Sequence, residues 1–241
     1  MSGTLYIVPT PVGNLEDMTF RAVDTLKNVD LILAEDTRTS GILLKHYGIS
    51  VPMKSHHKFN EHEEAPKIAQ RVLDGEKIAL ITDAGTPGIS DPGFMLSREC
   101  RKIGADVVCL PGPTAFVPAL VGSGLPCDRF VFEGFLPPKK GRHTRLTELS
   151  TEPRTIVIYE SPKRIAKTLK ELAEYFGKER KACVCREISK IHETYHFNSL
   201  ENLANEFEQN PAKGEMVLVV TGYEEKRKEK EKYKNQIIRE L

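Results

Sequence analysis

The sequence predicts an α/β protein with two α/β domains and a cleft between them, and three observations lead to this expectation. Short apolar runs alternate with amphipathic segments through the first half, a pattern typical of a parallel sheet with helices on both faces. Loops rich in proline and glycine follow three of these runs. A second series of apolar runs begins after residue 122, in a chain of 241 residues that is long enough for two domains.

The first half contains predicted strands and helices in alternation. The segment 18–29 has apolar residues at helical spacing, and Asn60 followed by Glu63 forms a capping pattern that predicts the start of a second helix. The predicted strands are short runs of mostly Leu, Ile, Val and Ala at 5–8, 31–34, 78–82 and 106–110.

The second half begins after a Gly- and Pro-rich break at 122–126. Ser161 followed by Pro162 predicts the start of a helix that continues to Phe176. Strands are predicted at 130–132, 155–159, 182–185, 192–197 and 216–220. We therefore expect an N-terminal α/β domain over 1–122, a C-terminal α/β domain over 127–223 and a charged, solvated tail over 224–241.

Composition excludes several classes of protein. Apolar residues make up 39% of the chain, and no apolar run approaches the ~20 residues that span a bilayer. The N-terminus has no basic region before an apolar one, so we expect a cytoplasmic protein. The five cysteines form no C-x-x-C pair and are odd in number, which favours reduced, buried thiols over disulfides or a metal site.

Charge is distributed unevenly along the chain. Residues 1–127 carry 12 Lys and Arg against 15 Asp and Glu, and residues 128–241 carry 23 against 19. A polyanionic partner would therefore meet the second half first.

The segment 82–93 is the most informative loop of the chain. It holds three glycines, two prolines and two aspartates directly after a predicted buried strand. Similar loops follow two other predicted strands, at 9–14 and 111–115. Open α/β sheets bind ligands at the carboxyl ends of their strands, so the three loops predict one shared cleft. None of them matches the standard dinucleotide or phosphate-loop motifs.

Two other groups of side chains allow more than one interpretation. Glu35 and Asp36 end a predicted strand, so they either face the cleft or, for Asp36, cap the following turn. His56, His57 and His62 lie near several glutamates, but their spacing fits no common metal site and solvated surface is the favoured interpretation.

A basic segment lies at 137–145. Its Lys139, Lys140, Arg142 and Arg145 have no acidic residue among them, and Lys163 and Arg164 open the following predicted helix. Short basic loops neutralise phosphates without reading sequence. These six side chains are our candidates for binding an RNA backbone.

Several motifs together resemble the tetrapyrrole-methylase fold family, the class III S-adenosylmethionine-dependent methyltransferases. The resemblance is strongest to its members that act on small-subunit ribosomal RNA, and it extends over residues 4–222. The motifs that carry it are T-P-x-G-N-L-x-D at 10–17, A-E-D-T-R at 34–38, D-A-G-T-P-x-I-S-D-P-G at 83–93, P-G-P-x-A at 111–115, F-x-G-F-L-P at 132–137, Y-E-S-P-x-R at 159–164 and K-G-E-x-V at 213–217.

The resemblance implies a homodimer that uses S-adenosyl-L-methionine, bound between the two domains, to methylate the 2′-oxygen of a cytidine ribose in the decoding region of 16S ribosomal RNA. The partner is then the RNA or the 30S subunit. Carried over position by position, the implied cofactor contacts are Pro11, Asp83, Gly85, Thr86, Gly88, Ile89, Thr114, Ala115, Tyr159 and Met216.

A ribose hydroxyl is a poor nucleophile, so a base or a cation that favours the alkoxide would help the transfer. The candidates near the expected cleft are Glu160, Lys163, Glu187 and Glu215, and no metal is required. Two alternatives stay open. One is a C-methyltransferase of a tetrapyrrole or corrinoid precursor, which would need a large apolar trough, and the other is a ribosome-binding module without catalysis.

Overall fold

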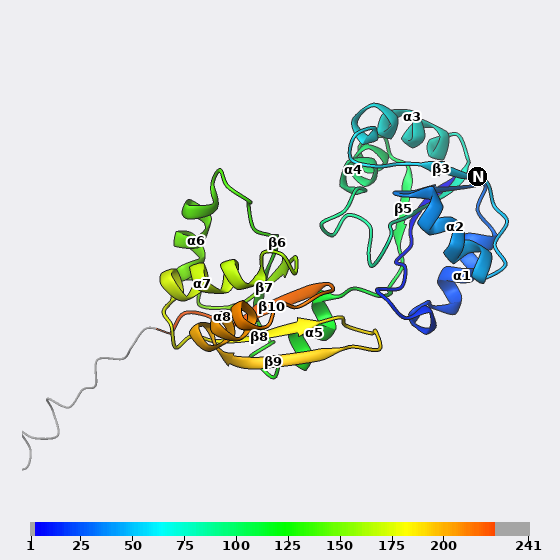
Figure 1. Cartoon of the computed structure of the whole chain (residues 1–241). Helices are drawn as coiled ribbons and strands as arrows, with labels where there is room; N and C mark the ends of the chain where they lie inside the picture. Colours follow the sequence, from blue (N-terminus) through cyan, green and yellow to red (C-terminus); the bar gives the residue numbers. More distant parts are fainter. Residues whose placement is uncertain (1–2, 225–241) are drawn as a thin grey trace, which may run out of the picture.

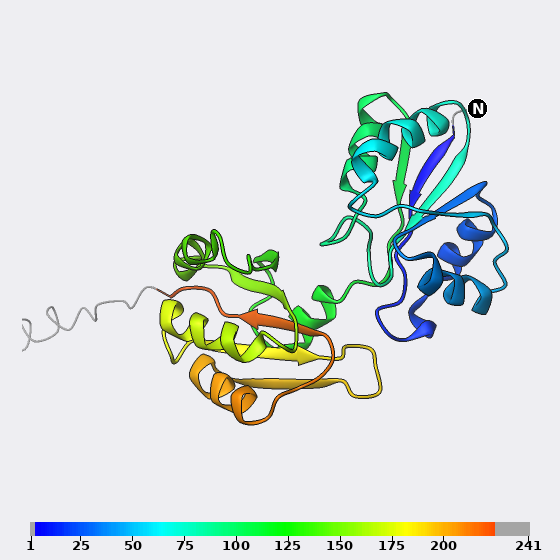
Figure 2. The same ribbon diagram turned by 45° about the horizontal axis from the view of Figure 1, so that its top comes forward.

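The computed structural model describes residues 3–224, which form two α/β domains, each built on a five-stranded sheet (Figure 1). The predicted tail lies outside the described residues, apart from Glu224. Figure 2, a turned view, shows the two sheets in separate lobes with α5 close to the connection between them. Within residues 3–224, no helix is long and apolar enough to cross a membrane.

The first sheet is entirely parallel, as the alternating pattern predicted. Its order is β3-β2-β4-β1-β5, and every pair in it is parallel. The strands are β1 (Thr4–Ile7), β2 (Leu31–Ala34), β3 (Met53–Ser55), β4 (Lys77–Ile81) and β5 (Asp106–Cys109). The helices are the 3-10 turn η1 (Leu15–Asp17), α1 (Phe20–Lys27), α2 (Thr37–His46), α3 (Glu61–Leu73) and α4 (Phe94–Lys102).

Helices cover both faces of this sheet. Leu33 and Leu80 point to one face, where they pack with Ile68 of α3 and Leu96 of α4. Their neighbours along the strands point to the other face and pack with α1 and α2. Alternate side chains of a strand face opposite sides, so a strand buried on both faces is apolar throughout. All of the parallel β strands therefore end in loops at one shared edge.

The second sheet is mixed. Its order is β6-β7-β10-β8-β9, with β6 and β7 parallel and the other pairs antiparallel. The strands are β6 (Phe130–Phe135), β7 (Thr155–Glu160), β8 (Lys181–Arg186), β9 (Thr194–Ser199) and β10 (Met216–Val220). The helices are α5 (Phe116–Gly122), α6 (Arg142–Ser150), α7 (Ile165–Phe176) and α8 (Leu200–Gln209).

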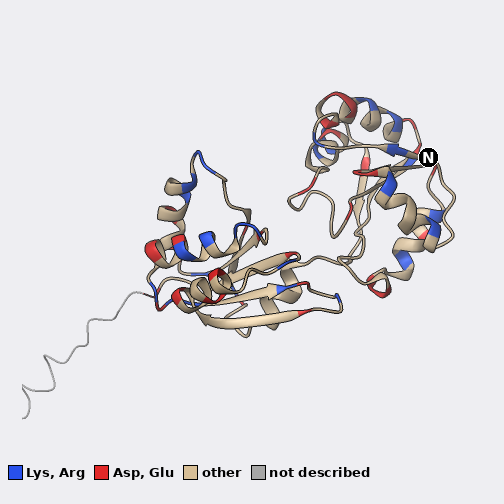
Figure 3. Ribbon diagram, viewed as in Figure 1, with Lys and Arg blue, Asp and Glu red and all other residues tan. Residues whose placement is uncertain are grey.

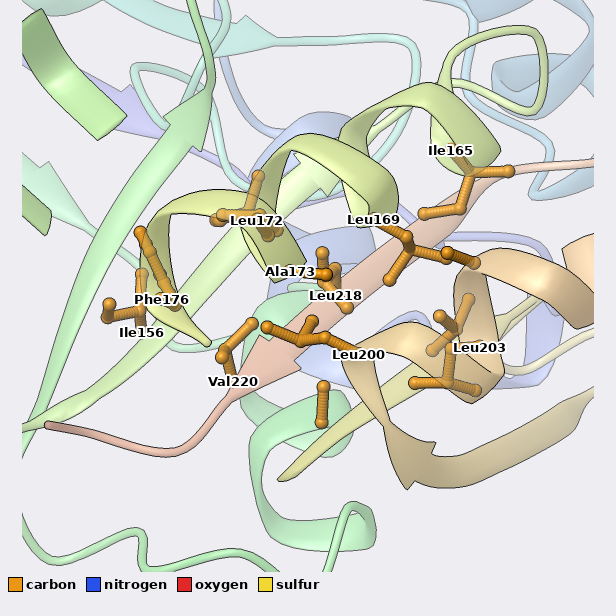
Figure 4. Close-up of a cluster of buried hydrophobic side chains, with 14 of the residues drawn as sticks. Ile156, Ile165, Leu169, Leu172, Ala173, Phe176, Leu200, Leu203, Leu218 and Val220 are labelled. Atoms are coloured by element: carbon orange, nitrogen blue, oxygen red, sulfur yellow. The ribbon is translucent and has the colours of Figure 1, made fainter. Parts of the chain in front are cut away.

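The main core of the second domain lies between this sheet and helices α6, α7 and α8. Figure 4 shows Leu169 of α7 and Leu203 of α8 directed toward Leu218 of β10. The helix α5 packs on the opposite face with a smaller apolar cluster that includes Cys183 and Cys185. Both thiols are buried and free, as expected for cysteines used as small hydrophobes, and so is Cys100, whereas Cys109 and Cys127 are exposed and contradict that expectation.

Several element boundaries differ from the sequence-based expectation. The helices α2, α5, α6 and α8 and the three-residue strand β3 were not predicted, and Arg142 and Arg145 of the expected basic loop lie in α6. Ser161 does not cap a helix: its carbonyl accepts from the amides of Arg164 and Ile165 in a turn, and α7 begins at Ile165. Asn60 precedes α3, but its side chain accepts from the amide of His57 instead of capping the helix.

Candidate active site

One cavity of about 440 Å³ lies between the two domains, where the strand-end loops of the first sheet face β7 and β10 of the second. The volume is in the range of sites for drug-sized cofactors. Its lining residues are Val12, Glu35, Thr82, Asp83, Ala84, Gly85, Thr86, Ile89, Ser90, Asp91, Thr114, Ala115, Phe135, Tyr159, Glu160, Ser161, Pro162, Cys185, Ile188, Glu215, Met216 and Val217.

The three loops that the sequence singled out are joined to one another. The amide and carbonyl of Thr10 bond to the carbonyl and amide of Gly85, both at 2.9 Å. Thr10 Oγ1 also donates to the carbonyl of Thr82 at 2.9 Å, and Thr86 Oγ1 donates to the carbonyl of Pro113 at 3.0 Å. The prediction of one shared cleft is therefore confirmed.

The loop 82–93 crosses from the first domain to the second. Gly85 and Gly88 have φ angles of 82° and 85°, which an L side chain rarely adopts, and at Gly85 glycine lets the main chain itself face the cavity. At the loop's tip, a Cβ placed on Gly134 of β6 would lie 3.0 Å from Ser90 Oγ. The loop thus touches the second sheet at a position that only glycine leaves open.

Aromatic rings form part of the wall that the second domain contributes. Tyr159, near the end of β7, packs edge-on against Phe132 and Phe135 with ring centroids 5.0 and 5.6 Å away. Burial raises the pKa of the Tyr159 phenol. The ring of Phe135 is more than half exposed although it lines the cavity, so it lies at the cavity mouth.

Carboxylates line the wall contributed by the first domain. Thr82 Oγ1 donates to Glu35 Oε2 at 2.7 Å, and the amide of Asp36 donates to Asp83 Oδ1 at 3.3 Å. Burial and the charge of Glu35 raise the pKa of Asp83, and the same two causes raise the pKa of Asp91 to about 6. This wall favours a positively charged ligand or one rich in hydroxyl groups.

Glu35 and Asp36 take the two roles that the sequence left open. Glu35 lines the cavity, whereas Asp36 caps α2 by accepting from the amide of Arg38 at 2.8 Å. The Arg38 side chain also bonds to Asp36 and lowers the pKa of that carboxyl to about 2.

Most of the cofactor contacts implied by the resemblance lie in the cavity wall. Pro11 and Gly88 are not among the lining residues, whereas Val12, which was not singled out, is. Gly88 instead shapes the loop, with its amide donating to the carbonyl of Pro92 at 3.1 Å. The cavity brings together Asp83, Gly85, Thr86, Ile89, Thr114, Ala115, Tyr159 and Met216.

The candidate base Glu160 is fully engaged by neighbouring donors. It is buried and accepts from the Ser161 amide at 2.7 Å, Arg164 Nε at 2.8 Å and Thr168 Oγ1 at 2.7 Å. Arg142 bonds to the same threonine oxygen and to Glu171. The carboxylate of Glu160 is thus a structural acceptor that fixes the end of β7 relative to α7.

The other three candidates lie at or beyond the edge of the cavity. Glu187 accepts from the Glu215 amide at 2.8 Å, which is the main cause of its lowered pKa. Lys190 bonds to both Glu187 and Glu215 at 3.0 Å. Glu215 lines the cavity, whereas Glu187 and Lys163 do not.

The six predicted RNA contacts fall into two groups. Arg142 is buried against Glu171 and Thr168, Arg145 is bound by Glu133 and Glu148, and Arg164 pairs with Glu160. These pairs neutralise the arginine charges within the fold. Among residues 3–224, no carboxylate pairs with the exposed Lys139, Lys140 or Lys163. Figure 3 shows positive charge on the loop between β6 and α6.

His56 contradicts the expectation of solvated surface. It is 1% exposed, and burial lowers its pKa. Its Nε2 lies 4.0 Å from Oε1 of the buried Glu61. That oxygen accepts from the amides of Gly93 and Met95 at 2.8 and 3.1 Å, so Glu61 anchors the end of the cavity loop. The sequence signalled Glu61 only as an acidic residue in a helix's first turn.

The fold and the site define a two-domain α/β protein with a cofactor-sized cavity lined by both domains, and comparison with known proteins identifies its class as methyltransferase. The family model for Tetrapyrrole (Corrin/Porphyrin) Methylases matches residues 4–204. The chain is 50% identical to Ribosomal RNA small subunit methyltransferase I of Haemophilus influenzae, over 92% of this chain and 80% of the relative. It is 42% identical to the Thermotoga maritima protein of that name, over 92% of this chain and all of the relative.

Two solved structures share the fold. Uroporphyrin-III-C-methyltransferase from Thermus thermophilus superposes with a TM-score of 0.63 at 21% identity, over 92% of this chain and 93% of that one. Diphthine synthase superposes with a TM-score of 0.69 at 14% identity, over 91% and 90%.

The chain belongs to the tetrapyrrole methylase family, in the group of relatives that carry the name Ribosomal RNA small subunit methyltransferase I. Its methyl donor is S-adenosylmethionine, the cofactor of this family. The residues present fit this molecule. The acidic wall suits its cationic and hydroxyl groups, and Val12, Ile89 and Met216 offer apolar surface for its adenine.

Removing the charge of Glu61 should weaken cofactor binding, although Glu61 does not line the cavity, because Glu61 anchors the end of the cavity loop. We expect Glu61→Gln to raise the Kd for S-adenosylmethionine by roughly 10-fold, because hydrogen bonds to a charged acceptor contribute more than those to a neutral one. Isothermal titration calorimetry measures this change. Glu63→Gln, on the exposed side of the same helix, is the control and should bind like the wild type. Equal affinities for both variants would contradict the anchoring role.

Proposed function

We propose that this chain transfers a methyl group from S-adenosylmethionine to the 2′-oxygen of a cytidine ribose in the decoding region of small-subunit ribosomal RNA. We further propose that it acts as a homodimer in the cytoplasm. The observation that carries the proposal is an exposed aromatic ring, Phe135, that lines the cavity, followed in the chain by two exposed lysines that form no ion pair within residues 3–224.

Phe135 and the lysines that follow it are close together in sequence. The ring lies at the cavity mouth, and the exposed Lys139 and Lys140 follow within the same loop, with Lys163 at the loop after β7. Bases taken out of a helix stack on aromatic side chains, and lysines neutralise the adjoining phosphates. A flipped nucleotide held in this way would present its ribose to the cavity.

The names of the relatives support the same substrate. The proteins at 50% and 42% identity are both named as methyltransferases of the ribosomal small-subunit RNA. The structures named for uroporphyrin and diphthine chemistry are at most 21% identical, so they support the fold and not the substrate.

Bound S-adenosylmethionine supplies an electrophilic methyl group on a sulfonium that is already a good leaving group. The chain's own residues have to hold the cofactor, align it with the acceptor oxygen and keep water away from the methyl group. Gly85, Thr86 and Ile89 would hold the cofactor along the loop, and Tyr159 and Met216 would close it from the second domain. Alignment of acceptor and donor, with exclusion of water, accounts for much of the rate of such transfers.

The test is transfer of labelled methyl groups to small ribosomal subunits, and to RNA extracted from them, taken from a strain that lacks this gene. We expect label at one cytidine, at a linkage that resists alkaline cleavage because its 2′-oxygen is methylated. Label on a base, or on a uroporphyrin or precorrin acceptor in place of RNA, would overturn the proposal.

The unpaired lysines should govern the salt dependence of RNA binding. We expect Lys139→Ala/Lys140→Ala to lower the slope of log Kd against log salt by about 1 to 2, because each neutralised phosphate contributes roughly 0.7–0.9 to it. Filter binding at several salt concentrations measures the slope. The matched control is Lys27→Ala/Lys77→Ala in the first domain, which should leave it unchanged. An unaltered slope in the Lys139→Ala/Lys140→Ala variant would show that these two lysines do not bind RNA phosphates.

Support for a homodimer comes from the α5 side of the second sheet. Phe130 of β6 and Tyr195 and Phe197 of β9 are more than a third exposed there, beside Val117 and Val121 of α5. Tyr195 lies directly against α5, since a Cβ on Gly122 would be 2.7 Å from its ring. Exposed apolar side chains gathered around one helix in this way are typical of a protein interface.

Charge placed on that face should separate the subunits. We expect Val121→Glu/Phe197→Glu to have the mass of one 27.1-kDa chain in light scattering, whereas the wild type has twice that mass. Ile42→Glu, at an exposed apolar position on α2, is the control and should remain dimeric. A monomeric wild type, or a dimeric double variant, would contradict this assignment.

A further inference from the structure

The carboxylates that line the cavity differ in how far they are engaged. Glu160 accepts three hydrogen bonds, and Glu215 pairs with Lys190. Glu35 accepts from Thr82 at 2.7 Å, and Asp83 accepts from the amide of Asp36. Burial raises the pKa of Asp83 despite this hydrogen bond.

Asp91 accepts a hydrogen bond from the Thr82 hydroxyl and is the lining carboxylate whose pKa is raised to about 6. It is half-buried in the cavity wall, and no lysine or arginine of the described chain forms an ion pair with it. It stands next to Ser90, whose hydroxyl lies beside Gly134 of β6, so the loop carries it to the boundary between the domains. Its charge influences Tyr159 on the opposite wall. Asp91 therefore faces the cavity between the two domains.

The surroundings of Asp91 strengthen it as a base. Burial is the largest cause of the raised pKa of Asp91, and the charges of Glu35 and Asp83 raise this pKa further. The hydrogen bond from the Thr82 hydroxyl lowers it. The resulting pKa of about 6 leaves the carboxylate ionised at neutral pH and more basic than an ordinary aspartate. Proton acceptors in catalysis work best when their pKa is close to the working pH.

We propose that Asp91 is the catalytic base, whose carboxylate accepts the proton of the hydroxyl group that is methylated. This inference rests on the proposed function, because it requires a hydroxyl acceptor. The O–H bond breaks and its proton goes to an Asp91 oxygen. A lone pair of the acceptor oxygen forms the new O–CH₃ bond, and the pair of the broken methyl–sulfur bond remains on sulfur as a neutral thioether. Asp91 then releases the proton to water.

The test compares Asp91→Asn, which keeps the shape but cannot take up the proton, with Asp91→Glu and the wild type. We expect Asp91→Asn to lower the single-turnover rate on small subunits by about 100-fold or more, the usual contribution of a general base. Asp91→Glu should recover part of the rate. Asp74→Asn, at an exposed position, is the matched control and should retain the wild-type rate.

Three further measurements distinguish a base from a merely structural residue. Calorimetry should give Asp91→Asn affinities within about 3-fold of the wild type for both S-adenosylmethionine and S-adenosylhomocysteine, a change of less than 0.7 kcal/mol. Carbon-13 NMR of labelled aspartate carboxyls should show one signal titrating near pH 6 that Asp91→Asn lacks. The wild-type rate should fall below that pH, where the Asp91 carboxylate is protonated.

Each contrary result has a clear meaning. An unchanged rate in Asp91→Asn, with an active wild type, would overturn the role of Asp91 and leave the proposed function standing. A selective loss of S-adenosylmethionine affinity over that of its thioether product would assign Asp91 to the sulfonium and overturn the proposal. A wild type without transfer to subunits or RNA would overturn the proposed function and this inference with it.

Discussion

The paired hydrogen bonds between Thr10 and Gly85 are the constraint on which the site depends. Thr10 is completely buried, and its main chain and hydroxyl together bind the loop after β1 to the loop after β4. A parallel sheet places the carboxyl ends of its strands at one edge, but it does not fix the loops beyond that edge. This contact does so, and the Thr86–Pro113 bond extends it to the third loop.

The two walls of the cavity differ in chemical character, because each domain contributes one of them. The first contributes carboxylates and exposed main chain from loop 82–93, while the second contributes Tyr159, Phe135 and apolar strand ends. Outside the cavity the second domain carries unpaired lysines, whereas Arg142, Arg145 and Arg164 are neutralised within it. A cationic donor and an anionic acceptor would thus meet complementary surfaces, as opposite charges across an interface favour binding and orientation.

Much of the fold could be predicted from the sequence, because its strands are short apolar runs and α7 carries a clear apolar stripe. The helix α2 could not, because a helix that opens with Thr, Arg, Thr, Ser and Gly depends on its Asp36 cap and on packing by Leu44. The motif residues of the cavity were also predictable. Asp91 was not, because its basicity arises from burial and from Glu35, which is distant in sequence.

The sequence by itself determined the alternating α/β order, the three loops and the family, since these depend on local periodicity and on residue types at fixed spacing. Only the tertiary structure decided which charged side chains are neutralised within the fold and which remain available to bind a ligand. Arg142 and Lys139 look equivalent in one basic segment, yet the first is buried against Glu171 and the second is exposed. Glu160 ends β7 and Asp91 lies in the loop after β4, yet three donors engage the first and the second has no cationic partner in the described chain. Pairing and burial are set by contacts between distant segments, and these determine the chemistry of a charged side chain.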